Sequence, residues 1–181
     1  LHSHKICHRD VKPDNVMYDR KSAKIWLIDF GVSKLWMEKN VRKEMLTNTG
    51  TPDYKAPELH EGGGYTQAID LWAAGVILFE MVEKRLPFRQ DYLIDTIKSI
   101  VDIDYQLGEV WFHISRYARD LMSRLFKPKC RRLTAEEALK APWFLERDPN
   151  RLVGPVISST TLSILFKYGN VEVGEDEDVE S

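Results

Sequence analysis

The chain has 181 residues, of which 43% are hydrophobic and 30% are charged, and its formal net charge is −2. This length suffices for one domain with a hydrophobic core, and the charge lacks the basic excess that is typical of nucleic-acid-binding proteins. No apolar run approaches the length of a membrane span and no signal peptide opens the chain, so we expect no membrane partner. The two cysteines, Cys7 and Cys130, match no metal-binding spacing and predict reduced thiols in a cytoplasmic protein, with the nucleus as an alternative location.

The first third of the chain predicts a β-hairpin followed by a long loop. Residues 16–18 and 24–28 are short β-favouring runs, and the polar residues between them suit a turn. Residues 31–56 are polar and irregular, so we expect a long loop, which in compact domains is usually functional or disordered. Gly62, Gly63 and Gly64 then predict a flexible joint.

The middle of the chain predicts helices, and the domain as a whole is expected to be mainly α. Residues 68–83 are apolar on nearly all sides, which indicates a buried helix that residues 86–88 end. Residues 92–101 predict an amphipathic helix. Residues 116–126 predict another, with one apolar stripe formed by Ala118, Leu121, Met122 and Leu125.

Two further features close the sequence. Thr134 and Glu137 form a capping box that opens a helix, which Pro142 is expected to end. Residues 146–170 are expected to form an extension with an apolar patch at 155–168, and residues 171–181 an acidic disordered tail.

Five motifs occur in a fixed order along residues 1–145. His-Arg-Asp-Val-Lys-Pro-Asp-Asn at 8–15 is followed by Asp-Phe-Gly at 29–31, Gly-Thr-Pro-Asp-Tyr-Lys-Ala-Pro-Glu at 50–58, Asp-Leu-Trp-Ala-Ala-Gly at 70–75, and Arg-Leu-Thr at 132–134 with Ala-Pro-Trp-Phe at 141–144. In this order they resemble the eukaryotic protein kinases of serine/threonine type, closest to the calcium/calmodulin-dependent group. The resemblance implies the C-terminal lobe of the protein kinase-like fold, with a short β-hairpin that carries the catalytic and metal-binding loops.

The same resemblance implies an activity, which is transfer of the γ-phosphoryl group of ATP to a protein serine or threonine, with ATP and Mg²⁺ as cofactors. Phosphoryl transfer requires positioning and charge neutralisation more than covalent chemistry. Asp10 would accept or orient the proton of the attacking hydroxyl, while Lys12 would offset the charge of the phosphate. Asn15 and Asp29 would hold Mg²⁺ through oxygen ligands, which suit a hard cation. Thr51 would contact Asp10 and Lys12 and place the substrate hydroxyl.

Substrate choice and regulation follow from further positions of the resemblance. Asp14 and Glu80 match positions where relatives recruit arginine upstream of the phosphosite, which implies a basic protein substrate, although both residues could equally be solvated surface charges. Arg9 precedes the catalytic Asp10, and in relatives such an arginine pairs with a phosphorylated activation loop. Thr47 resembles that phosphosite, with Thr49 as a weaker candidate, and either implies an upstream activating kinase. The alternative is an unmodified loop threonine.

Other motif residues are expected to be structural. His8 and Phe30 would pack in the core, and Asp70 would anchor the backbone of the catalytic loop from the buried helix. Glu58 and Arg132 would form a buried ion pair. The segment Lys-Pro-Lys-Cys-Arg-Arg at 127–132 departs from the family pattern, with Lys in place of Asp and one extra residue, so Arg131 stays an alternative partner.

The catalytic loop lies very early in the chain, which begins with Leu rather than Met, so we read the sequence as a fragment. None of the ATP-binding elements that precede this loop in relatives lies upstream of it. We therefore expect the 181-residue chain alone to have no kinase activity. The alternative hypothesis is a non-catalytic docking or regulatory module that keeps the lobe without its chemistry.

Overall fold

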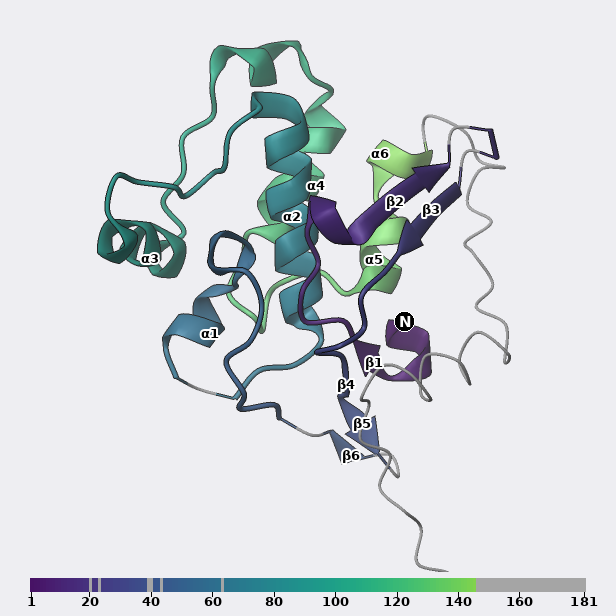
Figure 1. The fold of residues 1–181 in the computed structure, drawn as a ribbon. Helices are drawn as coiled ribbons and strands as arrows, with labels where there is room; N and C mark the ends of the chain where they lie inside the picture. Colours follow the sequence, from purple (N-terminus) through teal and green to yellow (C-terminus); the bar gives the residue numbers. More distant parts are fainter. Residues whose placement is uncertain (20, 23, 39–40, 43, 63, 146–181) are drawn as a thin grey trace, which may run out of the picture.

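The computed structural model describes residues 1–19, 21–22, 24–38, 41–42, 44–62 and 64–145. The predicted extension at 146–170 and the predicted acidic tail at 171–181 lie outside these residues, as does Gly63 of the predicted joint. In the described part the fold is largely helical and is arranged around α2 (Ala68–Glu83), with α1 (Pro57–His60) and α3 (Leu93–Asp102) on one side and the β2–β3 hairpin on the other (Figure 1). This is the mainly α lobe that the sequence predicts.

Helix α2 forms the centre of the core, because its apolar residues face neighbours in several directions. Trp72, Val76 and Phe79 are fully buried. The helix ends at Glu83, so it has the predicted range of 68–83 and stops before residues 86–88. Lys84 adopts a left-handed backbone, with φ 58°, and its N–H donates to the carbonyl of Glu80. This C-terminal cap satisfies a carbonyl that the helix itself leaves open.

An aromatic cluster ties α2 to the helices that follow it. Trp72 stacks on Phe88 with ring centroids 5.1 Å apart, and Phe126 contacts both rings. Helix α4 (Arg116–Leu125) buries the predicted stripe of Ala118, Leu121, Met122 and Leu125. Gly75 permits the close approach of α2 to α4, since a Cβ atom there would lie 3.0 Å from both Leu125 Cβ and a ring carbon of Phe126.

The last helices are shorter than the sequence suggested. α5 (Ala135–Leu139) opens with the predicted capping box of Thr134 and Glu137. The prediction for Pro142 was wrong, because α5 ends at Leu139 and Pro142 begins a separate helix, α6 (Pro142–Leu145). Proline suits the first position of a helix, where its missing N–H has no partner to lose.

The predicted hairpin is present as β2 (Val16–Asp19) and β3 (Lys24–Leu27), which pair antiparallel with Val16 opposite Leu27. The expectation that residues 31–56 form an irregular loop was wrong in part. This segment contains β4 (Lys34–Leu35), β5 (Met37–Glu38) and β6 (Val41–Arg42), and β4 pairs with β1 (Ile6–Cys7). Two-residue strands are too short to show the alternation by which strands are predicted.

Four short 3-10 helices complete the described elements: η1 (His2–His4), η2 (Pro13–Asn15), η3 (Pro52–Tyr54) and η4 (Glu109–His113). Both cysteines are free thiols, with Cys7 buried and Cys130 exposed. Among the described residues, no helix combines the length and apolar character that crossing a bilayer demands.

Candidate active site

The backbone of the predicted catalytic loop is fixed by Asp70, the third residue of α2. Its Oδ2 accepts the backbone N–H of His8 at 2.8 Å, and its Oδ1 accepts that of Arg9 at 2.9 Å. This is the anchoring contact expected of Asp70. The Nε2 atom of His2, 2.8 Å from Oδ2, adds a partner that the sequence did not indicate. Arg9 has φ 70°, and such left-handed non-glycine residues persist only where surrounding contacts hold them.

Asp70 makes the stability of the fold depend on pH. Burial alone raises the pKa of Asp70, but the hydrogen bond and charge of His2 and the two backbone N–H groups outweigh it and hold the pKa below its ordinary value of 3.8. Stability from a carboxyl with a depressed pKa is fully present above the unfolded-state pKa and is lost as the pH falls through the folded-state pKa. The Asp70 contribution is therefore present at neutral pH and is lost below about pH 3.8.

We predict that Asp70→Asn lowers the free energy of unfolding at pH 7 by about 1–3 kcal/mol, because an amide cannot accept from both backbone N–H groups and pair with His2. Urea unfolding of both proteins should show that the difference narrows as the pH falls below 4. Two curves that run parallel between pH 7 and pH 3 would contradict the role given to the carboxylate.

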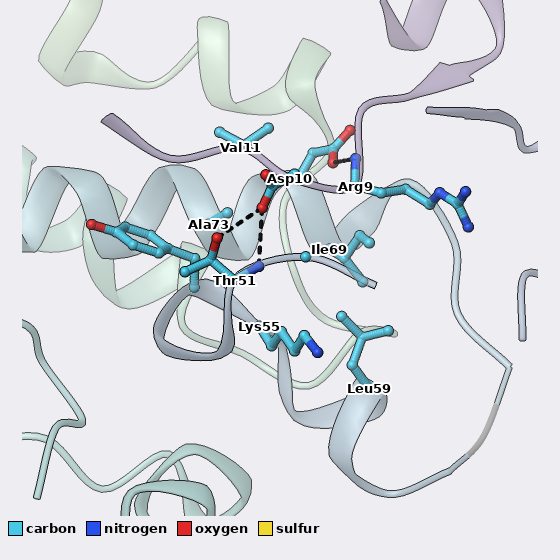
Figure 2. A pocket seen from close by; sticks show the side chains of 11 residues that line it. Arg9, Asp10, Val11, Thr51, Lys55, Leu59, Ile69 and Ala73 are labelled. Atoms are coloured by element: carbon cyan, nitrogen blue, oxygen red, sulfur yellow. Dashed lines mark hydrogen bonds between the residues drawn. The ribbon is translucent and has the colours of Figure 1, made fainter. Parts of the chain in front are cut away.

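Asp10 lies at the centre of a closed network of hydrogen bonds, and Figure 2 shows the part of it between Asp10 and Thr51. Its Oδ1 accepts both the backbone N–H and the hydroxyl of Thr51, each at 3.0 Å. Its Oδ2 lies 2.9 Å from Lys12 Nζ and 3.1 Å from Asn15 Nδ2. Lys12 Nζ also donates to Thr51 Oγ1 at 2.8 Å, which closes the ring. The structure thus brings together the four residues that the sequence places up to 41 positions apart.

These contacts favour the charged forms of both Asp10 and Lys12. Burial alone raises the pKa of Asp10, but the hydrogen bonds from Lys12 and Thr51 hold it below the ordinary value. The carboxylate of Asp10 in turn raises the pKa of Lys12. At neutral pH the site therefore presents a fixed acceptor beside a fixed cation, which is the arrangement that preorganised charge stabilisation requires.

Asn15 and Asp29 lie at the same end of the hairpin. Asn15 precedes β2, and its carbonyl accepts the N–H of Ile28, the residue before Asp29, at 2.9 Å. Asp29 is exposed and has φ 59°, a left-handed conformation that the motif alone did not reveal. The Nδ2 group of Asn15 donates to Asp10, so its amide oxygen is the atom that remains for other contacts.

This pair of oxygen donors fits Mg²⁺, which is usually bound through one or two protein oxygens together with substrate phosphates. Within the described residues, no group of three or more His, Cys, Asp or Glu side chains is placed to hold a metal ion. An Asn–Asp pair completed by phosphates is the kind of site that the hairpin end can supply.

His8 and Phe30 pack as expected. Their rings meet edge to face with centroids 4.9 Å apart, and His8 is fully buried. His8 Nδ1 accepts the N–H of Asp10 at 3.3 Å, so the ring proton lies on Nε2, which donates to the carbonyl of Ile28 at 2.9 Å. His8 thereby links the loop of Asp10 to the loop of Asp29.

The buried ion pair is formed by Glu58 and Arg132, so the alternative with Arg131 is excluded. The two guanidinium nitrogens of Arg132 donate to the two oxygens of Glu58 at 2.8 and 2.9 Å. Arg132 also donates to the carbonyls of Lys127 and Ala68 and lies over the ring of Trp72, 5.1 Å from its centroid. The pair therefore ties α1 to α2 and to the loop after α4.

Glu80 and Asp14 lie close to Tyr54. The hydroxyl of Tyr54 donates to Glu80 Oε2 at 2.7 Å, and burial followed by the Glu80 carboxylate raises the pKa of Tyr54. The charges of Asp14 and Asp53 act on Tyr54 in the same direction, which places several carboxylates around one phenol. Asp14 itself is exposed.

Arg9 and Thr47 are connected through Tyr65, which the sequence did not single out. Arg9 Nη1 donates to the Tyr65 hydroxyl at 3.0 Å, and that hydroxyl donates to the carbonyl of Thr47 at 2.6 Å. Arg9 Nε donates to the carbonyl of Val32. Thr47 is exposed and Thr49 is half-buried.

Four residues of the site were missed by sequence reasoning: His2, Tyr54, Lys55 and Tyr65. Tyr54 and Lys55 lie inside a motif that was recognised, so their position was a usable signal. His2 contacts a residue 68 positions away in sequence, and Tyr65 contacts one 56 positions away. No local sequence pattern predicts contacts over such separations.

Comparison with known proteins agrees with this geometry. The family model described as "Protein kinase domain" matches residues 1–144. The chain therefore belongs to the protein kinase family, and its described part has the features of the C-terminal lobe.

Its curated relatives are serine/threonine kinases. The chain is 35% identical over 153 residues to calcium/calmodulin-dependent protein kinase type I of Schizosaccharomyces pombe, covering 82% of this chain and 45% of that protein. It is 34% identical over 149 residues to a calcium/calmodulin-dependent protein kinase of Emericella nidulans, covering 79% and 36%. It is 37% identical over 149 residues to the serine/threonine-protein kinase H1 homolog of Danio rerio, covering 80% and 35%.

These relatives confirm the predicted resemblance to serine/threonine kinases that include the calcium/calmodulin-dependent type. The chain spans less than half the length of each of them.

Proposed function

We propose that this chain is the catalytic and substrate-binding lobe of a protein kinase that transfers the γ-phosphoryl group of ATP to serine or threonine hydroxyls. The observation that carries the proposal is the closed network of Asp10, Lys12 and Thr51, with Asp10 Oδ1 accepting two hydrogen bonds from Thr51 and Oδ2 lying 2.9 Å from Lys12 Nζ. A network that served only to pack the fold would not require a carboxylate paired with an ammonium group at the protein surface.

In this proposal Asp10 orients the substrate hydroxyl and accepts its proton as the bond to phosphorus forms. Its depressed pKa supports a carboxylate that is ready to accept a hydrogen bond at neutral pH. Lys12 would offset the negative charge of the transferred phosphate. Thr51, which contacts both, positions the acceptor. Positioning and charge stabilisation of this kind account for most of the catalysis in phosphoryl transfer.

Asn15 and Asp29 are the residues that would hold Mg²⁺ from the end of the hairpin. The metal would supply positive charge that offsets the negative charge of the ATP phosphates. The free amide oxygen of Asn15 and the exposed carboxylate of Asp29 support this assignment.

The substrate in this proposal carries basic residues upstream of the phosphosite. The carboxylates of Asp14 and Glu80 near Tyr54 support it, because an arginine guanidinium can bind carboxylates with two parallel hydrogen bonds. Glu80 already accepts the Tyr54 hydroxyl with one oxygen, so Asp14, which is exposed, is the freer of the two.

Regulation by phosphorylation of Thr47 is part of the same proposal. The chain of contacts from Arg9 through Tyr65 to the Thr47 carbonyl brings a guanidinium close to this exposed threonine. A phosphate on Thr47 adds negative charge that Arg9 can capture, which would order the loop. An upstream kinase would supply that phosphate, and Thr49 is the second candidate.

The test uses the product of the complete gene with peptides that differ only at the acceptor or upstream of it. We expect phosphate on Ser and Thr peptides but not on the Tyr peptide. An upstream Arg should raise kcat/KM about tenfold relative to Ala, a gain that Asp14→Asn reduces. Equal rates for the Arg and Ala peptides would contradict the basic substrate. A folded protein that binds these peptides without phosphorylating any would favour the non-catalytic docking module.

A further inference from the structure

A lysine, Lys55, lines the pocket beside Asp10. The pocket is lined by residues of the catalytic loop, of the segment around η3 and of α2, including Asp10, Thr51, Tyr54 and Lys55. Figure 2 shows Lys55 beside Leu59, with the Thr51 backbone between Lys55 and Asp10. Lys55 Nζ donates to Asn48 Oδ1 at 2.8 Å, and no carboxylate of the described residues lies within ion-pair distance of it.

The two carboxylates that line this pocket are already balanced, and the Arg9 guanidinium donates to the Tyr65 hydroxyl and the Val32 carbonyl. Asp10 has Lys12 at 2.9 Å, and Asp70 has His2 together with two backbone N–H groups. Within the described part of the chain, Lys55 Nζ is paired with the neutral amide of Asn48, whose own Nδ2 donates to the Leu59 carbonyl at 3.3 Å. Burial lowers the pKa of Lys55, with the charge of Asp10 acting in the opposite direction. This is the behaviour of a cation that gains stability when an anion arrives.

The neighbouring histidine does not supply that anion. Burial, followed by the charge of Lys55, lowers the pKa of His60, and its buried Nε2 atom has no hydrogen-bond partner among the described residues. The two side chains thus leave this part of the pocket positive or neutral.

The spacing between Lys55 and Thr51, which contacts Asp10, suits a residue next to the phosphoacceptor. Thr51 caps η3 at its N-terminus and Lys55 caps it at its C-terminus, so the two lie four residues apart, roughly 8 Å at about 2 Å per residue of 3-10 helix. In an extended peptide, side chains two residues apart on one face lie about 6–7 Å apart. A hydroxyl held at Asp10 therefore brings a side chain one or two residues away to Lys55.

We propose that Lys55, held by Asn48, selects protein substrates that carry Asp or Glu within two residues of the phosphoacceptor. This inference rests on the proposed function, and it adds a specificity that the acidic positions Asp14 and Glu80 do not supply. The preferred substrate then combines basic residues near Asp14 and Glu80 with an acidic residue near Lys55.

The test measures peptide binding to the product of the complete gene by fluorescence anisotropy without ATP, so that it does not depend on phosphoryl transfer. All peptides have one Ser and an upstream Arg, and a single Glu is placed at each position from two before to two after the Ser. We expect one such position to tighten binding about tenfold relative to Ala. Lys55→Met should abolish that gain, and Lys55→Glu should reverse it in favour of a Lys at the same position.

Lys98→Glu is the matched control, since it changes the charge equally at an exposed residue of α3 that does not line the pocket. It should leave the preference unchanged, and the unfolding midpoint of Lys55→Met should equal that of the unaltered chain. If the upstream Arg still matters but no Glu position depends on Lys55, the inference is wrong and the proposed function stands. If the folded chain binds no peptide, both are contradicted.

Discussion

Asp10→Asn should lower kcat for peptide phosphorylation by about 10²–10⁴-fold in the product of the complete gene, the range expected for loss of a general base. The substitution keeps the size and planar shape of the side chain but removes the negative charge and one acceptor. The amide cannot accept hydrogen bonds from both Thr51 and Lys12, so the acceptor hydroxyl loses its orientation. The proton of that hydroxyl also loses the carboxylate that would accept it. KM should change much less, because the peptide is bound mainly by other residues.

The control for this prediction is Asp19→Asn. Asp19 is an exposed carboxylate at the end of β2, where it accepts from the Lys21 N–H and from the Ser22 hydroxyl of the turn. The same chemical change there should leave kcat unaltered. A kcat for Asp10→Asn within a few-fold of the unaltered protein would exclude Asp10 as the catalytic base.

Glu58→Gln should lower the free energy of unfolding of the 181-residue chain by about 3–5 kcal/mol, because it leaves the Arg132 guanidinium buried without its counter-charge. For a protein of this size, that loss corresponds to a fall in Tm of about 6–20 °C. Both side chains are almost completely buried, with exposed fractions of 0% for Arg132 and 6% for Glu58. Urea unfolding and thermal unfolding followed by circular dichroism measure the change.

Two comparisons separate the ion pair from a general effect of substitution. Glu58→Leu combined with Arg132→Met should cost less than the sum of the single changes, since the double variant leaves no unpaired charge. Lys140→Ala removes a shorter ion pair, 2.6 Å from Glu136, but both partners are exposed and no change in midpoint is expected. An equal effect of Lys140→Ala and Glu58→Gln would show that burial does not govern the strength of these pairs.

Long periodic segments of this chain could be predicted from sequence. The apolar run of α2 and the stripe of α4 repeat over several turns, so burial of one face is the only way to satisfy them. The capping box of α5 is equally local, since Thr134 and Glu137 lie three residues apart and make their contacts with each other. The two-residue strands β4, β5 and β6 lack this repetition, and their pairing is decided by distant neighbours.

The candidate site likewise contains residues that could be predicted from the sequence and contacts that could not. Asp10, Lys12, Asn15, Asp29 and Thr51 could be named because they stand in motifs of fixed order, and the structure places Asp10, Lys12, Asn15 and Thr51 in one network. Their chemical roles remain predictions. The bridge of Tyr65 between Arg9 and Thr47 and the Lys55–Asn48 contact could not be predicted. Both depend on how the segment around η3 folds back on α1 and α2, and neither leaves a periodic or spacing signal.

The left-handed backbones of Arg9 and Asp29 were also beyond sequence reasoning. Glycine is the usual residue at such positions; aspartate is enriched among the non-glycine exceptions, but nothing in an arginine side chain indicates a positive φ. Asp70 holds Arg9 through its backbone N–H, and the Asp29 carboxylate accepts the N–H of Gly31 at 3.2 Å. The positive φ angles of Arg9 and Asp29 are therefore held by contacts that form only in the folded chain.

The central claim is that the network around Asp10 positions a serine or threonine hydroxyl for phosphorylation. The most direct measurement is transfer of labelled γ-phosphate from ATP to a serine peptide by the native protein, isolated from its source cells with an antibody against residues 172–181. We predict label on the serine, absent when the same protein carries Asp10→Asn. A folded native protein that leaves the peptide unlabelled, or label that persists in Asp10→Asn, would contradict the claim.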